Sequence, residues 1–255
     1  MNYIMSLPFL VLALSFVALW LSARTGAFFR KRRRNLEEDE RRDLGLIEAA
    51  ALTLLGLIIG FSFSMAISRY DQRKNLEEAE ANAIGAEYVR ADLLPAADAA
   101  RVRTLLRNYV DQRVLFYETR DERQLLQIDA ATAQLESDLW FAAQAPAAAQ
   151  PTPLVALAVS GMNDVLNSQG YTQAAWRNRI PVAAWGLMAA IAICCNLLIG
   201  YGAHRAEAKS VLFLVLPLVV SVSFFLIADL DSPRRGIIRV VPQNLLSLAE
   251  SLHGH

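Results

Sequence analysis

Long apolar stretches and long polar stretches follow one another along this 255-residue sequence. Four blocks are almost free of charged residues, and each is long enough to cross the ~30 Å of hydrocarbon in a bilayer as a helix. Between the second and third blocks, apolar residues recur at the spacing typical of one face of a water-exposed helix. The pattern therefore predicts an all-α membrane protein with four transmembrane helices and a helical domain inserted between the second and third.

The block boundaries divide the chain into consecutive parts. They are a first transmembrane helix (1–23), a charged loop (24–48), a second transmembrane helix (49–68), a helical extramembrane domain (69–180), a third transmembrane helix (181–203), a short loop (204–209), a fourth transmembrane helix (210–230) and a C-terminal tail (231–255). Pro217 predicts a kink in the fourth helix. The tail is expected to end in a short amphipathic helix that starts near Pro242.

The second apolar block continues into charged sequence without a proline or a turn until Pro95. We interpret Glu48 to Leu94 as one helix, whose first half crosses the bilayer and whose second half is too charged for lipid. Small residues recur at every fourth position of the first half and share one face; they are Gly56, Gly60, Ser64 and Ser68. They predict a helix-packing seam, although small residues are also common in membrane helices that pack differently.

Three further helices are predicted in the inserted domain. The first follows Asp98, a suitable N-cap, and ends near Glu118, and the second covers 125–139 with apolar residues at heptad spacing. The run AQAPAAAQPTP is predicted to be a linker, because its prolines are expected to end the helix before it. A third helix covers 154–166, and GYTQ is expected to break or bend it. The aromatic residues at the helix ends are expected in the core: Tyr117, Trp140 and Phe141.

The charge composition excludes several classes of function. Twenty-five basic and 25 acidic residues are interspersed, so no basic stripe for nucleic acid is present. The three histidines lie in a short loop and at the C-terminus, and no catalytic or phosphate-binding motif occurs. We therefore expect neither an enzyme nor a bound metal or cofactor. Cys194 and Cys195 are adjacent, which is poor geometry for a disulfide, and they are expected to be small packing residues.

Acidic residues cluster where the second helix leaves its apolar half. Glu77, Glu78 and Glu80 stand close to Arg73 and Lys74, which is typical of a solvated helix face. A carboxylate-bound metal site is the alternative. It is disfavoured because metal sites in helical bundles usually add a histidine three residues from a glutamate.

Several stretches resemble a known family. The run LLGLIIGFSFSMAISRYDQRK is similar to the second transmembrane helix of bestrophins, because Gly60-Phe61 is followed by Arg69 and an aromatic residue, Tyr70. The runs RYDQRKNLEEAEANAIGAEYVRADLLP and ADLDSPRRGIIRVVPQNL resemble a bacterial bestrophin-like family that is known as a domain of unknown function. The order of two spans, a helical domain and two spans also resembles bestrophins.

The resemblance implies a pentameric ion channel in the bacterial cytoplasmic (inner) membrane, with the lipid bilayer and inorganic ions as its partners. Bestrophin pores are narrowed by three apolar side chains four residues apart on this helix, and these positions fall on Thr53, Leu57 and Phe61. Thr53 departs from the apolar pattern. The acidic calcium clasp of animal bestrophins is absent, so calcium gating is not implied. Charged residues near the span ends are candidates for the pore mouth: Glu48, Arg69, Asp229 and Asp231.

A non-conducting membrane scaffold is the competing hypothesis. It requires only the packing seam, and its helical domain would bind a partner or sense stress. The side of the membrane is a separate question. The first helix has no basic residue before it and a dense basic cluster after it, which favours an external helical domain. The analogy with bestrophins instead places this domain in the cytoplasm.

Overall fold

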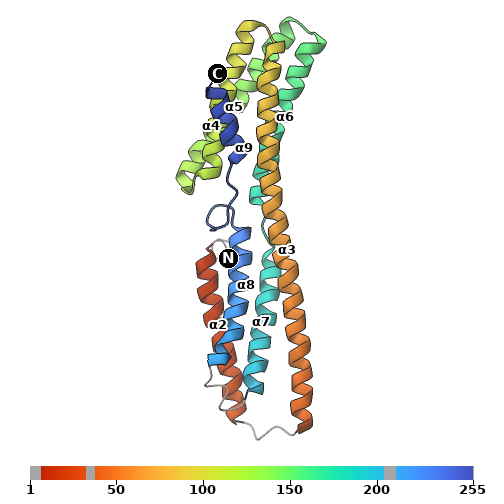
Figure 1. The fold of residues 1–255 in the computed structure, drawn as a ribbon, viewed down its shortest axis with the longest axis vertical. Coiled ribbons are helices and arrows are strands. Elements are labelled where there is room, and N and C mark those ends of the chain that lie inside the picture. The colour runs from red at the N-terminus through yellow and green to blue at the C-terminus, as the bar shows by residue number, and fades with distance from the viewer. Residues whose placement is uncertain (1–6, 33–37, 204–210, 255) are drawn as a thin grey trace. The chain divides into compact units, whose positions relative to one another are not determined.

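The computed structural model describes residues 7–32, 38–203 and 211–254, and this part of the chain contains only helices and their connections. The chain divides into two compact units. Unit 1 comprises the described residues up to Ser68 together with Arg179–Ile238, and unit 2 comprises Arg69–Asn178 together with the residues from Arg239 onward. Figure 1 shows the order of the elements along the chain. The predicted loop 204–209 lies outside the described residues.

Unit 1 contains α2 (Pro8–Arg32), the first half of α3 (Glu38–Arg90), α7 (Val182–Gly202), η3 (Val211–Leu214) and α8 (Val215–Asp231). In the described part of the chain, three helical stretches are long and apolar enough to cross a membrane: Pro8–Arg30, Asp39–Leu93 and Pro153–Gly202. The apolar part of the second stretch is 49–68, and the third stretch joins α6 to α7. The α8 helix has 17 residues and is not among the three.

Glycines bring α2 and α7 into backbone contact inside unit 1. A Cβ atom on Gly26 would overlap the carbonyl oxygen of Leu197, and one on Gly200 would overlap the carbonyl oxygen of Ala23. The hydroxyl of Ser22 donates to the carbonyl of Ile193 at 2.8 Å across the same contact. The close helix packing within the chain is therefore made by residues other than the predicted seam.

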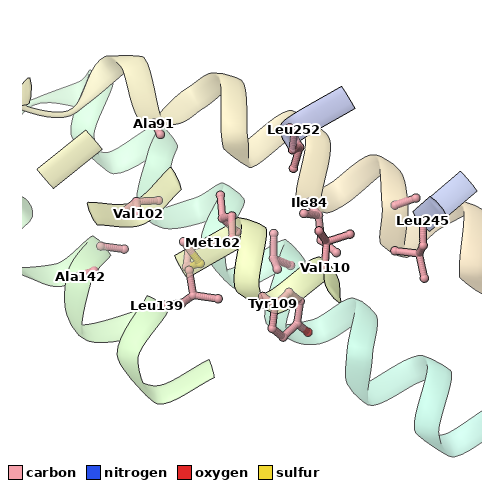
Figure 2. Close-up of a cluster of buried hydrophobic side chains, with 14 of the residues drawn as sticks. Ile84, Ala91, Val102, Tyr109, Val110, Leu139, Ala142, Met162, Leu245 and Leu252 are labelled. Carbon is pink, nitrogen blue, oxygen red and sulfur yellow. The ribbon is translucent and has the colours of Figure 1, made fainter. Parts of the chain in front are cut away.

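Unit 2 contains the second half of α3, η1 (Ala91–Leu93), α4 (Ala96–Glu118), α5 (Glu122–Ala149), α6 (Pro153–Arg177) and α9 (Gln243–His253). Its core is drawn from all the long helices of the unit, and Figure 2 shows Ile84, Tyr109, Leu139 and Met162 among its fully buried side chains. The tail contributes Leu245 and Leu252 to the same core. The predicted amphipathic helix of the tail is therefore an integral part of unit 2.

Polar side chains hold both ends of α9. The Glu77 carboxylate accepts hydrogen bonds from the Leu245 backbone N–H at 2.9 Å and from the Asn244 side chain at 2.7 Å, so it satisfies donors at the start of the helix. At the other end, the Arg107 guanidinium donates to the Leu252 carbonyl at 2.9 Å. The tail is thus fixed at both helix termini, where backbone groups lack partners within the helix.

Several helix boundaries differ from the expectations. The α5 helix runs through Pro146 to Ala149, because one missing donor in the last turn leaves most of its bonds intact, and the connection to α6 is correspondingly short. The α6 helix continues through GYTQ to Arg177, since Thr172 is buried and its hydroxyl donates to Glu80 at 3.1 Å. The α4 helix begins at Ala96, so Asp98 lies in its first turn and is not the N-cap.

Two features of unit 1 bear on the predictions: the conformation of the charged segment 24–48 and the position of Pro217. The charged segment 24–48, which was predicted to be a loop, is helical up to Arg32 and again from Glu38. Residues 33–37 lie outside the described part. Pro217 lies in the first turn of α8, directly after the 3-10 turn η3. The hydroxyl of Ser221 donates to the Pro217 carbonyl at 2.6 Å, which is a bond back to the preceding turn of its own helix.

Glu87 is a buried carboxylate on α3, well beyond its apolar half. The side chain is fully buried, and neither oxygen accepts a hydrogen bond from a described residue. A Cβ atom on Gly161 of α6 would overlap one of these oxygens, and the Arg90 guanidinium is 4.0 Å away. Burial raises the pKa of Glu87 to about 8 from its ordinary value of 4.5, while Arg90 lowers it and Asp164 raises it.

We expect this carboxylate to make stability depend on pH. The folded state keeps Glu87 protonated where the unfolded chain has already lost the proton, so the free energy of unfolding falls as pH rises from 4.5 to about 8. Glu87→Gln keeps the shape and removes the titration, and it should stabilise the protein on the order of a few kcal/mol at about pH 9 and little at about pH 5. Thermal unfolding in detergent, followed by far-UV circular dichroism, measures the effect.

Glu78→Gln is the matched control, because Glu78 is exposed on the same helix. Equal pH profiles for wild type and Glu87→Gln would contradict the assignment.

Candidate functional site

One face of α3 is buried in unit 1 and the opposite face is open. Leu55, Ser62 and Ala66 are buried, and their spacing of seven and four residues places them on one side of the helix. Glu48 lies on the same side, where a Cβ atom on Gly202 of α7 would lie 2.6 Å from its carboxylate. This side therefore packs against the chain's own helices.

The predicted seam and pore neck both lie on the open side of α3. A Cβ atom on Gly56 or Gly60 would meet no atom of the described residues within 4 Å, and Ser64 and Ser68 are exposed. The predicted neck residues are exposed as well: Thr53, Leu57 (54%) and Phe61 (65%). The chain thus leaves small residues and an adjacent ridge of larger residues available on the same face.

Thr53 fits an apolar ridge better than its residue type suggests. Its hydroxyl donates to the carbonyl of Ala49 at 2.8 Å, within the same helix. A threonine that bonds back to its own helix has its polar group engaged, so its methyl group is the part left to meet other groups. The three positions four residues apart can therefore form a continuous apolar surface.

The four candidate mouth charges have different environments. Glu48 is half-buried against α7, and Arg69 is half-buried at the start of unit 2. Asp229 and Asp231 are both buried. Asp229 accepts the backbone N–H groups of Ile237 and Ile238, and Asp231 accepts that of Ile180 at 3.1 Å. The two aspartates therefore hold the turn after α8 and the start of α7.

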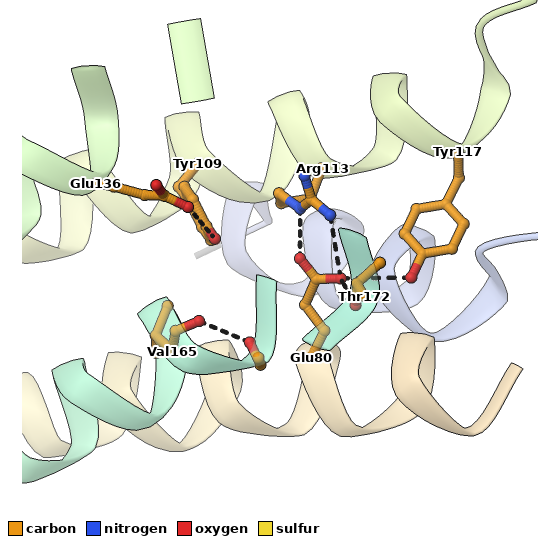
Figure 3. A network of polar contacts seen from close by, with 8 residues as sticks. Glu80, Tyr109, Arg113, Tyr117, Glu136, Val165 and Thr172 are labelled. Atoms are coloured by element: carbon orange, nitrogen blue, oxygen red, sulfur yellow. Dashed lines mark hydrogen bonds and ion pairs between the residues drawn. The ribbon is translucent and has the colours of Figure 1, made fainter. Parts of the chain in front are cut away.

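Unit 2 contains a buried ion pair between α3 and α4 (Figure 3). Both side chains are fully buried, and Arg113 donates to both carboxylate oxygens of Glu80. Tyr117 at 3.4 Å and Thr172 at 3.1 Å donate to the same carboxylate. Burial lowers the pKa of Arg113, but the Glu80 carboxylate outweighs it and holds the pKa above its ordinary value. The pair is kept charged because four donors converge on one carboxylate.

The interpretation of the acidic cluster as a solvated face was wrong. Glu77 and Glu80 are buried, and only Glu78 of the three is exposed. Arg73, Glu77 and Glu80 follow one another at spacings of four and three, and Ile84 continues the series, so the helical period itself indicated a core face. The interpretation missed this spacing because most of the residues on the face are charged. In the described part of the chain, no group of three or more potential metal ligands is present.

The aromatic residues are divided between core and surface. Tyr117 is buried and packs edge to face with Trp176 at a ring distance of 5.2 Å. Trp140 is partly buried against the core. Phe141 is 63% exposed, so its assignment to the core was wrong: it follows Trp140 directly, and neighbouring residues point to different sides of a helix.

The fold and the open apolar face of α3 define a helical protein of membrane type. The sequence model of the Bestrophin-like domain matches residues 10–245, and the chain belongs to this family. No curated protein matches the chain.

Solved structures of bacterial bestrophin homologues share the fold. A bestrophin homologue from Klebsiella pneumoniae solved by zinc phasing has 13% identity, covers 96% of this chain and 96% of its own, and superposes with a TM-score of 0.65. Two point variants of the Klebsiella pneumoniae homologue give TM-scores of 0.63 and 0.67 at 14% and 11% identity; both cover 96% of this chain, and 98% and 97% of their own. This similarity establishes the bestrophin fold across nearly the whole chain.

Removing Glu80 should destabilise the protein strongly. Glu80→Ala leaves Arg113 buried without its counter-charge, which typically costs about 3–5 kcal/mol of unfolding free energy. Glu78→Ala removes an exposed glutamate from the same helix and should change stability by about 0.5 kcal/mol or less. Chemical unfolding in detergent measures the free energy of unfolding of both variants and of the wild type.

A double substitution distinguishes the ion pair from general damage to the core. Combining Glu80→Ala with Arg113→Met removes the unpaired charge, so the loss should be smaller than the sum of the two single losses. Additive losses would contradict the coupling.

Proposed function

We propose that this protein is a homo-oligomeric ion channel, most simply a pentamer, in the bacterial cytoplasmic membrane. The observation that carries the proposal is that the small-residue seam and the ridge of Thr53, Leu57 and Phe61 share a face of α3 that the described residues leave uncovered. Several copies of such a helix around an axis would have both a packing surface and a lining surface. Membership of the bestrophin-like family supports the same function.

The proposed topology has four spans. They are α2, the first half of α3, α7, and α8 together with the preceding η3 turn. The 17 residues of α8 reach nearly across the hydrocarbon, and η3 adds a further apolar turn. Residues 69–180 then lie outside the membrane, on the external side according to the basic cluster that follows the first helix.

The ridge would act as a neck that limits ion flow. Apolar side chains at a narrow point disfavour water and therefore raise the barrier for ions. Glu48 and Arg69 lie beyond opposite ends of this ridge and supply charges of both signs. Asp229 and Asp231 already accept backbone hydrogen bonds, so their contribution to the mouth would be electrostatic and at a distance.

Assembly through the seam predicts a change of mass. Gly60→Leu adds bulk where the single chain has open space, so each subunit should still fold while the close approach of two helices is lost. Light scattering after size-exclusion chromatography in detergent should report smaller particles. Gly186→Leu is the matched control, because Gly186 on α7 also has open space around it. An unchanged mass for Gly60→Leu would show that subunits do not meet at this seam.

A limiting neck predicts a gain of conductance. Combining Leu57→Ala with Phe61→Ala removes two exposed side chains from the ridge and should raise single-channel conductance several-fold in planar bilayers. Leu21→Ala with Phe28→Ala removes a similarly exposed pair from α2 and should leave conductance unchanged. Equal conductance in both variants would contradict the neck.

The competing function is a non-conducting scaffold whose helical domain binds a partner. Exposed apolar side chains on unit 2 favour it, and they include Leu126, Phe141, Leu154 and Tyr171. The bilayer recordings separate the two functions, because a scaffold gives no current in wild type or in the Leu57→Ala, Phe61→Ala variant.

A further inference from the structure

The turn after α8 folds back tightly onto the end of that helix. The carboxylate of Asp229 accepts the N–H of Ile237 at 2.7 Å and that of Ile238 at 2.8 Å. A Cβ atom on Gly236 would lie 2.5 Å from the carbonyl oxygen of Asp229, so the close return requires glycine. Ser232 and Pro233 are buried within the turn. Residues 232–238 therefore form a tight turn that is held by the Asp229 carboxylate.

This turn covers the outward face of α8 only at its last turn, where Asp229 lies. Leu218 and Val222 are exposed, and Asp229 follows Val222 by seven residues, which places it on the same side of the helix. Asp229 is nevertheless only 1% exposed, and the backbone of Ile237 and Ile238 is bound to its carboxylate. The two isoleucine side chains, 65% and 41% exposed, therefore extend the apolar outward face of α8 beyond its last turns.

Arginines surround these isoleucines. Arg234 and Arg235 belong to the turn itself and are partly exposed. Arg179 is exposed and precedes Ile180, whose N–H is bound to Asp231 at the end of α8. The charges of Asp231 and Arg235 both act on the Arg179 guanidinium, so the two arginines lie near each other. The local charge is positive, because three arginines accompany two aspartates.

We propose that residues 234–238 form an interfacial anchor, in which Ile237 and Ile238 enter the acyl boundary and Arg234, Arg235 and Arg179 bind anionic phospholipid headgroups. The anchor rests on the proposed role of α8 as a span. A lipid surface fits the combination of features, since the apolar patch continues the outward face of a membrane helix and is bordered by cations that match phosphate. Two adjacent exposed isoleucines that continue the apolar face of a membrane helix fit lipid better than water.

Site-directed spin labelling of the full chain in lipid vesicles tests the anchor. A single label is placed at Ile237→Cys in a background with Cys194→Ala and Cys195→Ala. Molecular oxygen concentrates in hydrocarbon and a charged nickel complex stays in water, so a label at the lipid boundary should collide several-fold more with oxygen than with nickel. A label at Val222→Cys reports on α8 itself, and one at the exposed Leu126→Cys of unit 2 is the control that the covalent label alone does not create lipid contact.

The outcomes are distinct. Shielding of the Ile237 label from both reagents would mean that a second copy or another protein covers the turn, and high nickel access would mean water; either result overturns the anchor. If Val222 still shows lipid exposure, the span survives without the anchor. If Val222 is also shielded or wet, the span on which the anchor rests fails with it.

The headgroup contact has its own test. Spin-labelled phosphatidylglycerol should associate with the wild-type protein several-fold more than spin-labelled phosphatidylcholine. Combining Arg234→Gln with Arg235→Gln should remove most of that preference. Arg120→Gln with Arg123→Gln removes two exposed arginines from unit 2 and is the matched control for charge loss. An unchanged preference in the Arg234, Arg235 variant overturns the role of these arginines.

Discussion

One face of α3 is buried from Leu55 onward, and each unit uses its own part of this face. In unit 1 this face carries Leu55, Ser62 and Ala66, and in unit 2 it carries Arg73 and Glu80. The helical period keeps all these positions on one side, because steps of three and four residues return to the same face. The face can therefore change from apolar to charged without any break in the helix.

Unit 2 uses its buried charges as connectors between helices. Glu80 joins α3 to Arg113 and Tyr117 of α4 and to Thr172 of α6, while Glu77 holds the start of α9. A buried carboxylate is tolerated where several donors converge on it, and it is costly where donors are missing. Glu87 illustrates the second case, since its oxygens accept no hydrogen bond from the described residues and its pKa is raised accordingly.

Unit 1 connects its helices through small residues and backbone groups. Gly26 and Gly200 permit backbone contact between α2 and α7, and Asp229 and Asp231 bind the backbone at the end of α8. With these faces engaged, the side of α3 that carries Gly56 and Gly60 is left open. A helix that faces outward from its own chain is consistent with assembly around that helix, which is the basis of the proposed channel.

The sequence by itself determined the helical class and most helix positions, because apolar periodicity and proline-free stretches are local properties of the chain. The family followed from runs of residues that resemble it. It also placed the seam and the ridge on a shared side of one helix, since that follows from spacing alone. Only the tertiary structure decided which side was open. It also decided that Glu77 and Glu80 are buried, because their partners Leu245 and Arg113 are distant in sequence. Asp229 is buried because the chain turns back and brings the backbone of Ile237 onto its carboxylate. Charge composition could not reveal this, as a carboxylate on a helix looks the same whether water or a buried arginine faces it.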